Sequence, residues 1–277
     1  MFIDDPMRTP GSDRQRSRAR RCGAEGRCGP ARCSLALAAL TSVAVPVHAD
    51  EVRVFVAGAA KAALERIAPE YARATGDTIV AVADTVGALR DRISGGERPD
   101  ATILSNAAID ALAARGIVAA DARREIGVVV SGLAVQRGAP LPDVSSPEAL
   151  RRALLAAKSI AHADGARGAT SGAHFAKVID QLGLREQLRE RIVVLPFGVD
   201  AIQGVADGKF DLGASQSSEI VPHAGVSFVG GQPPPYALTT AYTAAAVSGS
   251  AKGAALLRYL DSAAARAHFA ASGFTAP

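Results

Sequence analysis

Strand-like and helix-like segments alternate along residues 50–277, and this alternation limits the possible folds more than any other feature of the sequence. The segment VRVFVA (52–57) is rich in β-branched and aromatic residues, as strands are. The segment after it places Leu64, Ile67 and Tyr71 on one face of a helix. The same order of strand and helix recurs towards the C-terminus. This pattern predicts an α/β fold with mostly parallel sheets.

Two long strand-like segments, near residues 128–140 and 230–242, pass through Pro and Gly and divide the alternation. We interpret them as two crossover strands that join two domains. The first domain is then discontinuous and combines residues 50–130 with residues 238–277. Residues 131–237 form the inserted second domain. Each domain is expected to be a mostly parallel sheet flanked by helices.

The first 49 residues have the order of an export signal. An Arg-rich region precedes the apolar run SLALAALTSVAV (34–45), and Val47 and Ala49 occupy the small-residue positions of a cleavage site. The apolar run is too short to span a bilayer. We therefore expect a signal peptide that is cleaved near Ala49 and a mature chain in the periplasm. The alternative is a disordered tail followed by a stray buried helix.

Charge and cysteine content exclude two kinds of function for the mature chain. The formal charge of +4 arises in the leader, because the chain after Ala49 carries 23 basic and 23 acidic residues. A neutral body predicts no nucleic-acid partner. Every cysteine precedes Ala49, so disulfides and thiolate metal sites are excluded from the mature chain. These cysteines are Cys22, Cys28 and Cys33.

The stretch HADGARGATSGAHFAKVI (162–179) carries the strongest signs of a ligand site, and catalytic motifs do not explain it. GATSG has the glycine spacing of a hydrolase elbow but places Ser171 one residue late. A phosphate-binding loop requires a lysine before Thr170 or Ser171, and none is there. The histidines of the mature chain lack the spacing that places two rings on one metal ion. We predict no catalytic residue, no metal and no cofactor.

The remaining signal in this stretch is the turn from a strand into a helix. Thr170 or Ser171 is expected to cap the helix, and its first N–H groups favour an anion. The alternative is an ordinary capped helix without a ligand. The same turn recurs at Gly58, at residues 85–87 and at Gly198. Because ligands of open α/β sheets bind beyond the carboxyl ends of the strands, we predict a solute pocket between the two domains.

In this arrangement the chain resembles the periplasmic molybdate-binding proteins, which serve bacterial ABC importers. The resemblance covers nearly all of the mature chain. It rests on the segments VRVFVAGAAKAALERIAPEYARATG, GALRDRISGGERPDATILSN, AHADGARGATSGAHFAKVIDQLGL, VADGKFDLGASQSSEI and LLRYLDSAAARAHFAASGF. It implies a two-domain periplasmic binding fold of type II, a small-molecule or oxyanion ligand, an ABC permease as partner, and a monomer.

The recurring turns and the resemblance together predict which residues bind the ligand. They are Gly58, Ala59, Thr85, Val86, Gly87, Thr170, Ser171, Val199, Ser215 and Gln216. Ala59, Val86 and Gln216 stand where the family has two serines and a tyrosine. Each missing hydrogen bond to a charged ligand weakens binding by roughly 1.5–3 kcal/mol. We therefore expect a small anion or a polar organic acid in preference to molybdate.

Three functions are compatible with this sequence. The first, which we expect, is a receptor that closes over a small solute and delivers it to a membrane permease. The second is an exported enzyme of the same architecture, which needs a nucleophile–base pair that the sequence does not show. The third is a ligand sensor for a membrane signalling partner.

Overall fold

The computed structural model describes residues 49–276 of the chain. The expected signal peptide and the three cysteines lie outside the described residues. The strands are β1 (Glu51–Ala57), β2 (Thr78–Asp84), β3 (Ala101–Ser105), β4 (Val118–Gln136), β5 (Ile160–Ala163), β6 (Ile192–Leu195), β7 (Leu212–Gln216), β8 (Val226–Gly231) and β9 (Thr239–Val247). The helices are α1 (Gly58–Thr75), α2 (Val86–Ser94), α3 (Asn106–Ala113), α4 (Pro147–Ala156), α5 (Thr170–Gln181), α6 (Arg185–Leu188), α7 (Gly198–Ala206), α8 (Ser217–Ile220), α9 (Ala251–Leu260) and α10 (Ala263–Ala271).

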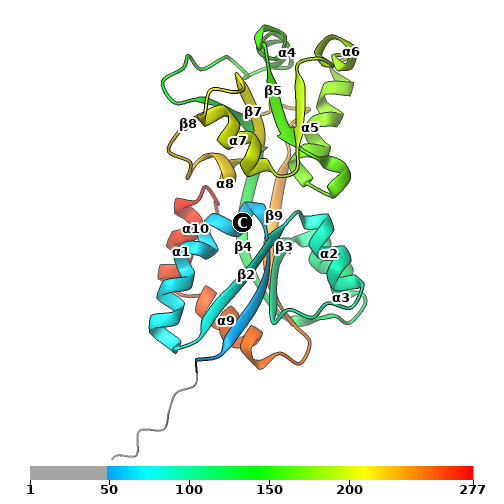
Figure 1. The fold of residues 1–277 in the computed structure, drawn as a ribbon. Helices are drawn as coiled ribbons and strands as arrows, with labels where there is room; N and C mark the ends of the chain where they lie inside the picture. The colour runs from blue at the N-terminus through cyan, green and yellow to red at the C-terminus, as the bar shows by residue number, and fades with distance from the viewer. Residues whose placement is uncertain (1–48, 277) are drawn as a thin grey trace, which may run out of the picture. The chain divides into compact units, whose positions relative to one another are not determined.

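The fold is the predicted α/β fold of two lobes, each a sheet flanked by helices (Figure 1). The strands form one continuous path in the order β2-β1-β3-β9-β4-β7-β5-β6, and β8 also pairs with β4. In one lobe, called the lower lobe after its place in Figure 1, parallel pairing joins β1 to β2 and β3. In the other, the upper lobe, parallel pairing joins β5 to β6 and β7. Because β4 pairs with β9 over its first part and with β7 and β8 over its last part, it connects the two lobes.

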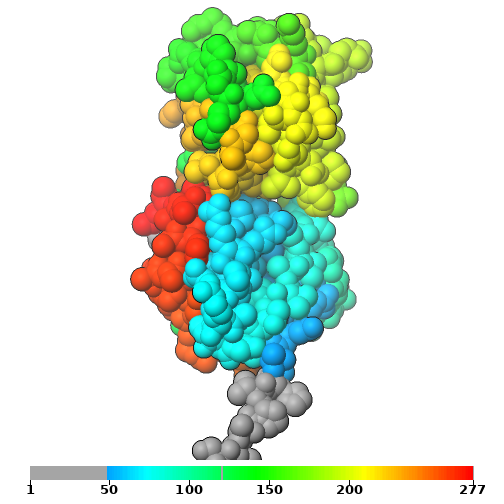
Figure 2. Space-filling model, turned by 60° about the vertical axis from the view of Figure 1, so that its left-hand side comes forward, coloured from blue at the N-terminus to red at the C-terminus, as the bar shows by residue number. Residues whose placement is uncertain are grey.

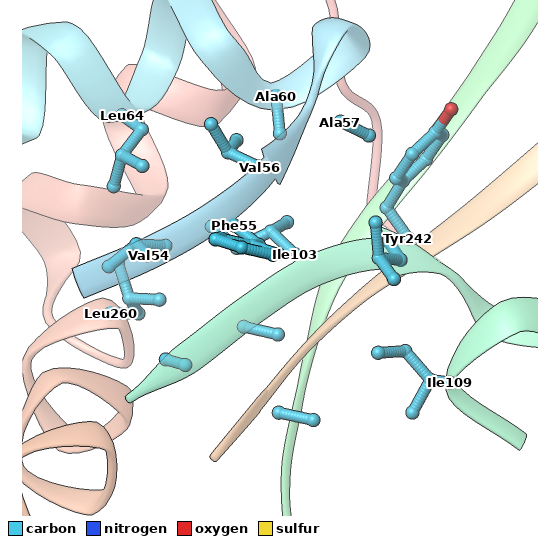
Figure 3. Close-up of a cluster of buried hydrophobic side chains, with 14 of the residues drawn as sticks. Val54, Phe55, Val56, Ala57, Ala60, Leu64, Ile103, Ile109, Tyr242 and Leu260 are labelled. Atoms are coloured by element: carbon cyan, nitrogen blue, oxygen red, sulfur yellow. The ribbon is translucent and has the colours of Figure 1, made fainter. Parts of the chain in front are cut away.

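The apolar side chains gather in separate cores, one in the lower lobe and two adjoining ones in the upper lobe. The lower core is built by β1, β3, β9 and the helices around them, and Phe55 and Ile103 lie at its centre (Figure 3). One upper core contains Leu133 and Phe175, and the other contains Ile202 and Val205. Each fully buried side chain of this size contributes roughly 1.5–3 kcal/mol to stability. The predicted boundaries of the two domains remain a prediction, which limited proteolysis would test.

The N-terminal caps of several helices follow the expected chemistry, with two corrections. The spacing of Ser145 and Glu148 in the sequence predicts a capping box with Ser145 as the cap of α4, but the Ser146 hydroxyl accepts the hydrogen bond from the Ala149 N–H, at 3.1 Å. Ser145 instead donates to Asp143, since it lies one residue too early for the helix. Likewise, Thr170 and Ser171 do not cap α5, because both lie inside its first turn.

None of the helices within residues 49–276 has both the length and the apolar character needed to cross a lipid bilayer.

Candidate ligand-binding site

A small cavity lies where the two lobes meet, and we call it the junction pocket. It is lined by the first residues of α1, α2, α5 and α7, and by Gln216, Glu219 and Tyr242. Its volume is about 190 Å³, below the roughly 300 Å³ at which sites for drug-sized ligands begin. The strands β1, β2, β5 and β6 each end at this point and turn into one of the four helices. The pocket therefore lies beyond the carboxyl ends of parallel strands and suits a small molecule.

Most of the residues that the sequence analysis selected line the junction pocket. They are Gly58, Ala59, Thr85, Val86, Thr170, Ser171, Val199 and Gln216. Gly87 and Ser215 lie behind the lining. Gly87 contacts the backbone of Gly168, and the Ser215 hydroxyl donates a hydrogen bond to Glu219. A binding role for these ten residues remains a prediction.

Three of the helices that begin at the junction pocket receive no cap from any described side chain. The residues before α1, α5 and α7 are Ala57, Ala169 and Phe197, which have no side-chain acceptor. The first two residues of each of these helices line the pocket. Uncapped N–H groups and the positive end of the helix dipole favour an anion. The pocket thus presents three separate sets of donors to a ligand.

Helices elsewhere in the protein show that capping is the usual arrangement in this chain. Ser146, Ser250 and Ser262 accept hydrogen bonds at the starts of α4, α9 and α10. Thr85 does the same for α2 at the pocket. Among the described residues, α3 is the one other helix of eight residues or more that lacks a side-chain cap, although Ser105 precedes it. Missing caps therefore concentrate at the junction pocket.

The two lobes touch each other through backbone groups at one edge of the pocket. The Gly87 N–H donates to the Gly168 carbonyl oxygen at 3.2 Å, and the Thr85 hydroxyl donates to the Arg167 carbonyl oxygen. The Arg167 guanidinium also lies 3.6 Å from Asp84. Figure 2 shows the lobes in contact at this level, where the surface of α1 meets that of the upper lobe. These contacts enclose the pocket from one side.

Glu219 in α8 is the most unusual residue of the pocket, and the sequence analysis missed it. Its carboxylate accepts hydrogen bonds from the Ser215 hydroxyl and the Gln216 N–H. It also lies against the first residues of α1 and α7, since a Cβ added to Gly58 or Gly198 would come within 2.7 or 2.4 Å of its oxygens. The signal was a single acidic residue among the small residues of LGASQSSEI.

Burial controls the protonation of Glu219 and of its neighbour Tyr242. Burial raises the pKa of the Glu219 carboxyl above its ordinary value, hydrogen bonds from Ser215 and Gln216 oppose this, and the charge of Asp200 adds to it. Burial and the charge of Glu219 raise the pKa of the Tyr242 phenol as well. Tyr242 is therefore a neutral hydroxyl at physiological pH. Figure 3 shows this hydroxyl pointing away from the apolar core.

Gln216 supplies a polar side chain that is not fully used inside the protein. The residue is 2% exposed and lines the pocket. Its amide nitrogen lies 3.5 Å from the Thr240 hydroxyl, and its Oε1 atom has no hydrogen-bond partner among the described residues. Buried polar atoms are almost always paired, so this unpaired oxygen beside the pocket is an exception in the protein.

Metal binding has no support in residues 49–276, where no three His, Cys, Asp or Glu side chains come together to hold an ion. The charged side chains that line the junction pocket are Lys61, Asp84 and Glu219. Lys61 forms an ion pair with Glu65, at 2.5 Å, and lies at the start of α1. The arrangement can bind an anion through N–H groups and hydroxyls, and it places a carboxyl group beside that anion.

The stability of the ligand-free protein should depend on pH through Glu219. A carboxyl whose pKa is raised by folding stabilises the folded state below its ordinary value of 4.5, and this contribution is lost as the pH rises through the folded-state pKa. A difference of one between the folded-state and unfolded-state pKa corresponds to about 1.4 kcal/mol. We expect Glu219→Gln to become more stable relative to the wild type as the pH rises from about 5 to about 8. Urea unfolding at several pH values measures this difference.

The pH dependence of the wild type alone would not isolate Glu219, because His162 also changes its protonation state between the folded and unfolded protein. Burial lowers the pKa of this histidine below its ordinary value of 6.5, so its contribution to stability is lost as the pH falls through the folded-state pKa. The two groups therefore act in opposite directions in the wild type. A constant difference between wild type and Glu219→Gln across the pH range would contradict the raised pKa of Glu219.

Comparison with known proteins assigns this fold to a family of binding proteins. Residues 52–275 match the family model described as bacterial extracellular solute-binding protein. The chain is 32% identical over 243 residues to an aconitate isomerase of a Pseudomonas species, an alignment that covers 83% of this chain and 90% of that protein. This relative confirms the family, and it is named as an enzyme.

Solved structures share the fold at low sequence identity. The periplasmic molybdate-binding protein of Azotobacter vinelandii superimposes with a TM-score of 0.68 at 21% identity, covering 82% of this chain and 99% of that one. A sulfate-binding protein of Mycobacterium tuberculosis gives a TM-score of 0.60 at 16% identity, covering 81% and 86%. At these identities the likeness shows the fold alone. The resemblance to molybdate-binding proteins that the sequence indicated is confirmed at this level.

Proposed function

Because this chain belongs to the family of bacterial extracellular solute-binding proteins, we propose that it captures a small organic polycarboxylate in the junction pocket. One observation carries the proposal: three helices start at the pocket without a side-chain cap, and their first residues line it. Carboxylates accept hydrogen bonds from such N–H groups. A ligand with several carboxylates can engage more than one helix start at once.

The other groups of the pocket support a carboxylic acid over molybdate. The pocket offers alanine at residue 59 and valine at residue 86, where the molybdate-binding family is expected to have hydroxyls. The hydroxyls that do line it come from Thr85, Thr170, Ser171 and Tyr242. The Thr85 hydroxyl already donates to the Arg167 carbonyl, so it has no proton left for a ligand. The carboxylates of one polycarboxylate can be shared among separate helix starts, so this ligand does not need the missing hydroxyls at residues 59 and 86.

Capture in the periplasm would serve import. In this proposal the receptor is a monomer that closes over the acid, as its relatives in ABC import are expected to do. It then passes the acid to an inner-membrane permease. A ligand sensor for a membrane signalling partner would use the same pocket. Deleting the cognate permease distinguishes the two, because uptake of the acid would stop only in the import system.

A second candidate function is an enzyme that acts on an unsaturated polycarboxylate. The relative at 32% identity is named as an aconitate isomerase, which favours this candidate. Aconitic acid is propene with three carboxyl groups, so it belongs to the ligand class proposed above. Binding without conversion supports the receptor alone, whereas conversion of the bound acid supports the enzyme.

Ligand binding is tested by thermal unfolding with a panel of acids and oxyanions. We expect citrate, cis-aconitate, trans-aconitate or propane-1,2,3-tricarboxylate to stabilise the mature chain more than molybdate or sulfate does. A ligand at about 100 times its Kd contributes about 2.7 kcal/mol, which raises the Tm by roughly 5–10 °C for a protein of this size. Stabilisation by molybdate or sulfate alone would contradict the proposed ligand class.

The variant Gln216→Ala links this stabilisation to the junction pocket. Its Tm without ligand should stay close to that of the wild type, because the change removes only a long hydrogen bond to Thr240, at 3.5 Å, and a contact with the Tyr242 phenol. The rise in Tm with the acid should shrink. A large fall in Tm without ligand, together with an unchanged response to the acid, would assign Gln216 to the core instead.

A further inference from the structure

We infer that Glu219 exchanges a proton with a carbon atom of the bound acid, so that the junction pocket isomerises unsaturated polycarboxylates as well as binding them. The inference rests on the proposed ligand class and goes beyond capture. It identifies Glu219 as the base, because of the position of this residue in the pocket.

The position of Glu219 is the first observation. Its carboxylate lies in the pocket wall beside the starts of α1 and α7, two of the three uncapped helices. Because Gly58 and Gly198 have no Cβ, the Glu219 carboxylate fits beside both of them. A Cβ on either glycine would collide with this carboxylate. Carboxylates of a ligand held at these two helix starts would therefore flank the Glu219 oxygens. The carbon chain between them would face those oxygens.

The absence of a structural ion pair is the second observation. No Lys, Arg or His in the part of the chain that the structure describes lies within 4.0 Å of the Glu219 carboxylate. Glu219 is half-buried, and a carboxylate that is partly removed from water without a cation is less favourable for folding than one in water. Its hydrogen bonds come from the Ser215 hydroxyl and the Gln216 N–H, which hold it in place. A carboxyl group that lies in a ligand pocket despite this unfavourable environment is a candidate for a catalytic acid or base.

The electrostatic surroundings make Glu219 a stronger base than a glutamate in water. Burial raises the pKa of Glu219, and Asp200 at the start of α7 acts in the same direction. The other charged or titratable groups that face it are Lys61, Asp84 and Tyr242 in the junction pocket. An adjoining cavity, which Glu219 also lines, adds Glu65, Arg66 and His223. A base is most effective when its pKa lies near the working pH.

The reaction needs no other reactant. In an acid such as aconitate, a methylene group lies next to a carbon–carbon double bond. The Glu219 carboxylate removes a methylene proton, so the C–H bond breaks and an O–H bond forms on the side chain. The electron pair spreads over the three-carbon unit and the attached carboxylate. Glu219 then returns the proton to the opposite carbon, which forms a C–H bond there and moves the double bond.

Other groups of the pocket stabilise the charge that develops during this transfer. Removing the proton increases the negative charge on a ligand carboxylate, and fixed N–H donors at helix starts stabilise such charge. The Tyr242 phenol is neutral and faces the same pocket, so it can donate a hydrogen bond as the charge forms. Glu219 moves the proton, and Tyr242 and the helix starts hold the anion.

The test follows cis-aconitate in D2O by proton NMR with the mature chain. The wild type should produce trans-aconitate, exchange methylene protons for deuterium, and work faster as the pH rises through the pKa of Glu219. Glu219→Gln should lose both conversion and exchange by about 100-fold or more, while calorimetry still detects cis-aconitate binding. Glu186→Gln changes an exposed acid on α6 in the same way and should keep the wild-type rate.

The outcomes separate this inference from the proposed function. Wild-type protein that binds cis-aconitate without conversion or exchange overturns the inference and leaves capture intact. Wild-type protein that binds none of the acids overturns both. Conversion by Glu219→Gln at the wild-type rate excludes Glu219 as the base. If Glu219→Gln does not bind, Glu219→Asp decides the assignment, because a shorter base should bind the acid and convert it more slowly.

Discussion

Alanine at residue 87 is expected to lower the affinity for the bound acid about tenfold or more. The ideal Cβ of Gly87 would lie 2.7 Å from the α carbon of Gly168, across the junction between the lobes. Overpacking of this kind costs about 1–3 kcal/mol, and neither backbone can turn aside as a side chain would. Since about 1.4 kcal/mol corresponds to a factor of ten in Kd, weakening the contact between the lobes should lower the affinity for the acid by at least that factor.

Calorimetry with the best acid of the panel measures this effect. The unliganded Gly87→Ala protein should unfold close to the wild-type temperature, because the contact joins the lobes and is not part of either core. Arg90→Gln changes an exposed side chain on the same helix and is the control. Equal affinity in wild type and Gly87→Ala would mean that the acid does not need this backbone contact.

Alanine at residue 172 is expected to destabilise the fold itself, by about 3 kcal/mol, at the upper end of the usual range for overpacking. In most helices a change from glycine to alanine stabilises by about 0.5–1 kcal/mol. Here the new Cβ would lie 2.0 Å from the carbonyl oxygen of Ala163, so α5 must move away from the end of β5. Urea unfolding measures the loss.

The control for residue 172 is Gly231→Ala, whose nearest new contact is at 3.6 Å and should be tolerated. Because Thr170 and Ser171 begin the same helix, Gly172→Ala should also weaken acid binding. A variant at residue 172 as stable as the wild type would show that α5 can shift at little expense. The tight packing at its start would then be incidental.

The sequence predicted the fold because its signals are local. The β-branched run 52–57, the apolar helix stripe that follows it and the repeated glycine turns each depend on neighbours in the chain. The turns at Gly58, residues 85–87, Thr170 and Gly198 could be grouped because parallel strands end at the same edge of a sheet. The sequence therefore predicted where the helices start around the pocket.

The residues that the sequence analysis missed are those whose place depends on long-range packing. Tyr242 comes from β9, which joins the pocket only because it pairs with β3 and β4. Glu219 is near Gln216 in sequence, but its contact with Gly58 joins residues far apart in the chain. The cap of α5 was wrong for a related reason. The first residue of a helix is set by backbone dihedral angles. Residue types predict that position only to within a residue or two.

The uncapped starts of α1, α5 and α7 also have a consequence for the resistance of the protein to proteolysis. A missing cap leaves a helix end weaker by about 0.5–2 kcal/mol, and here three such ends meet at one point. A captured acid would take the place of the absent caps. The protein without the acid should therefore be degraded by proteases faster than the acid-bound form.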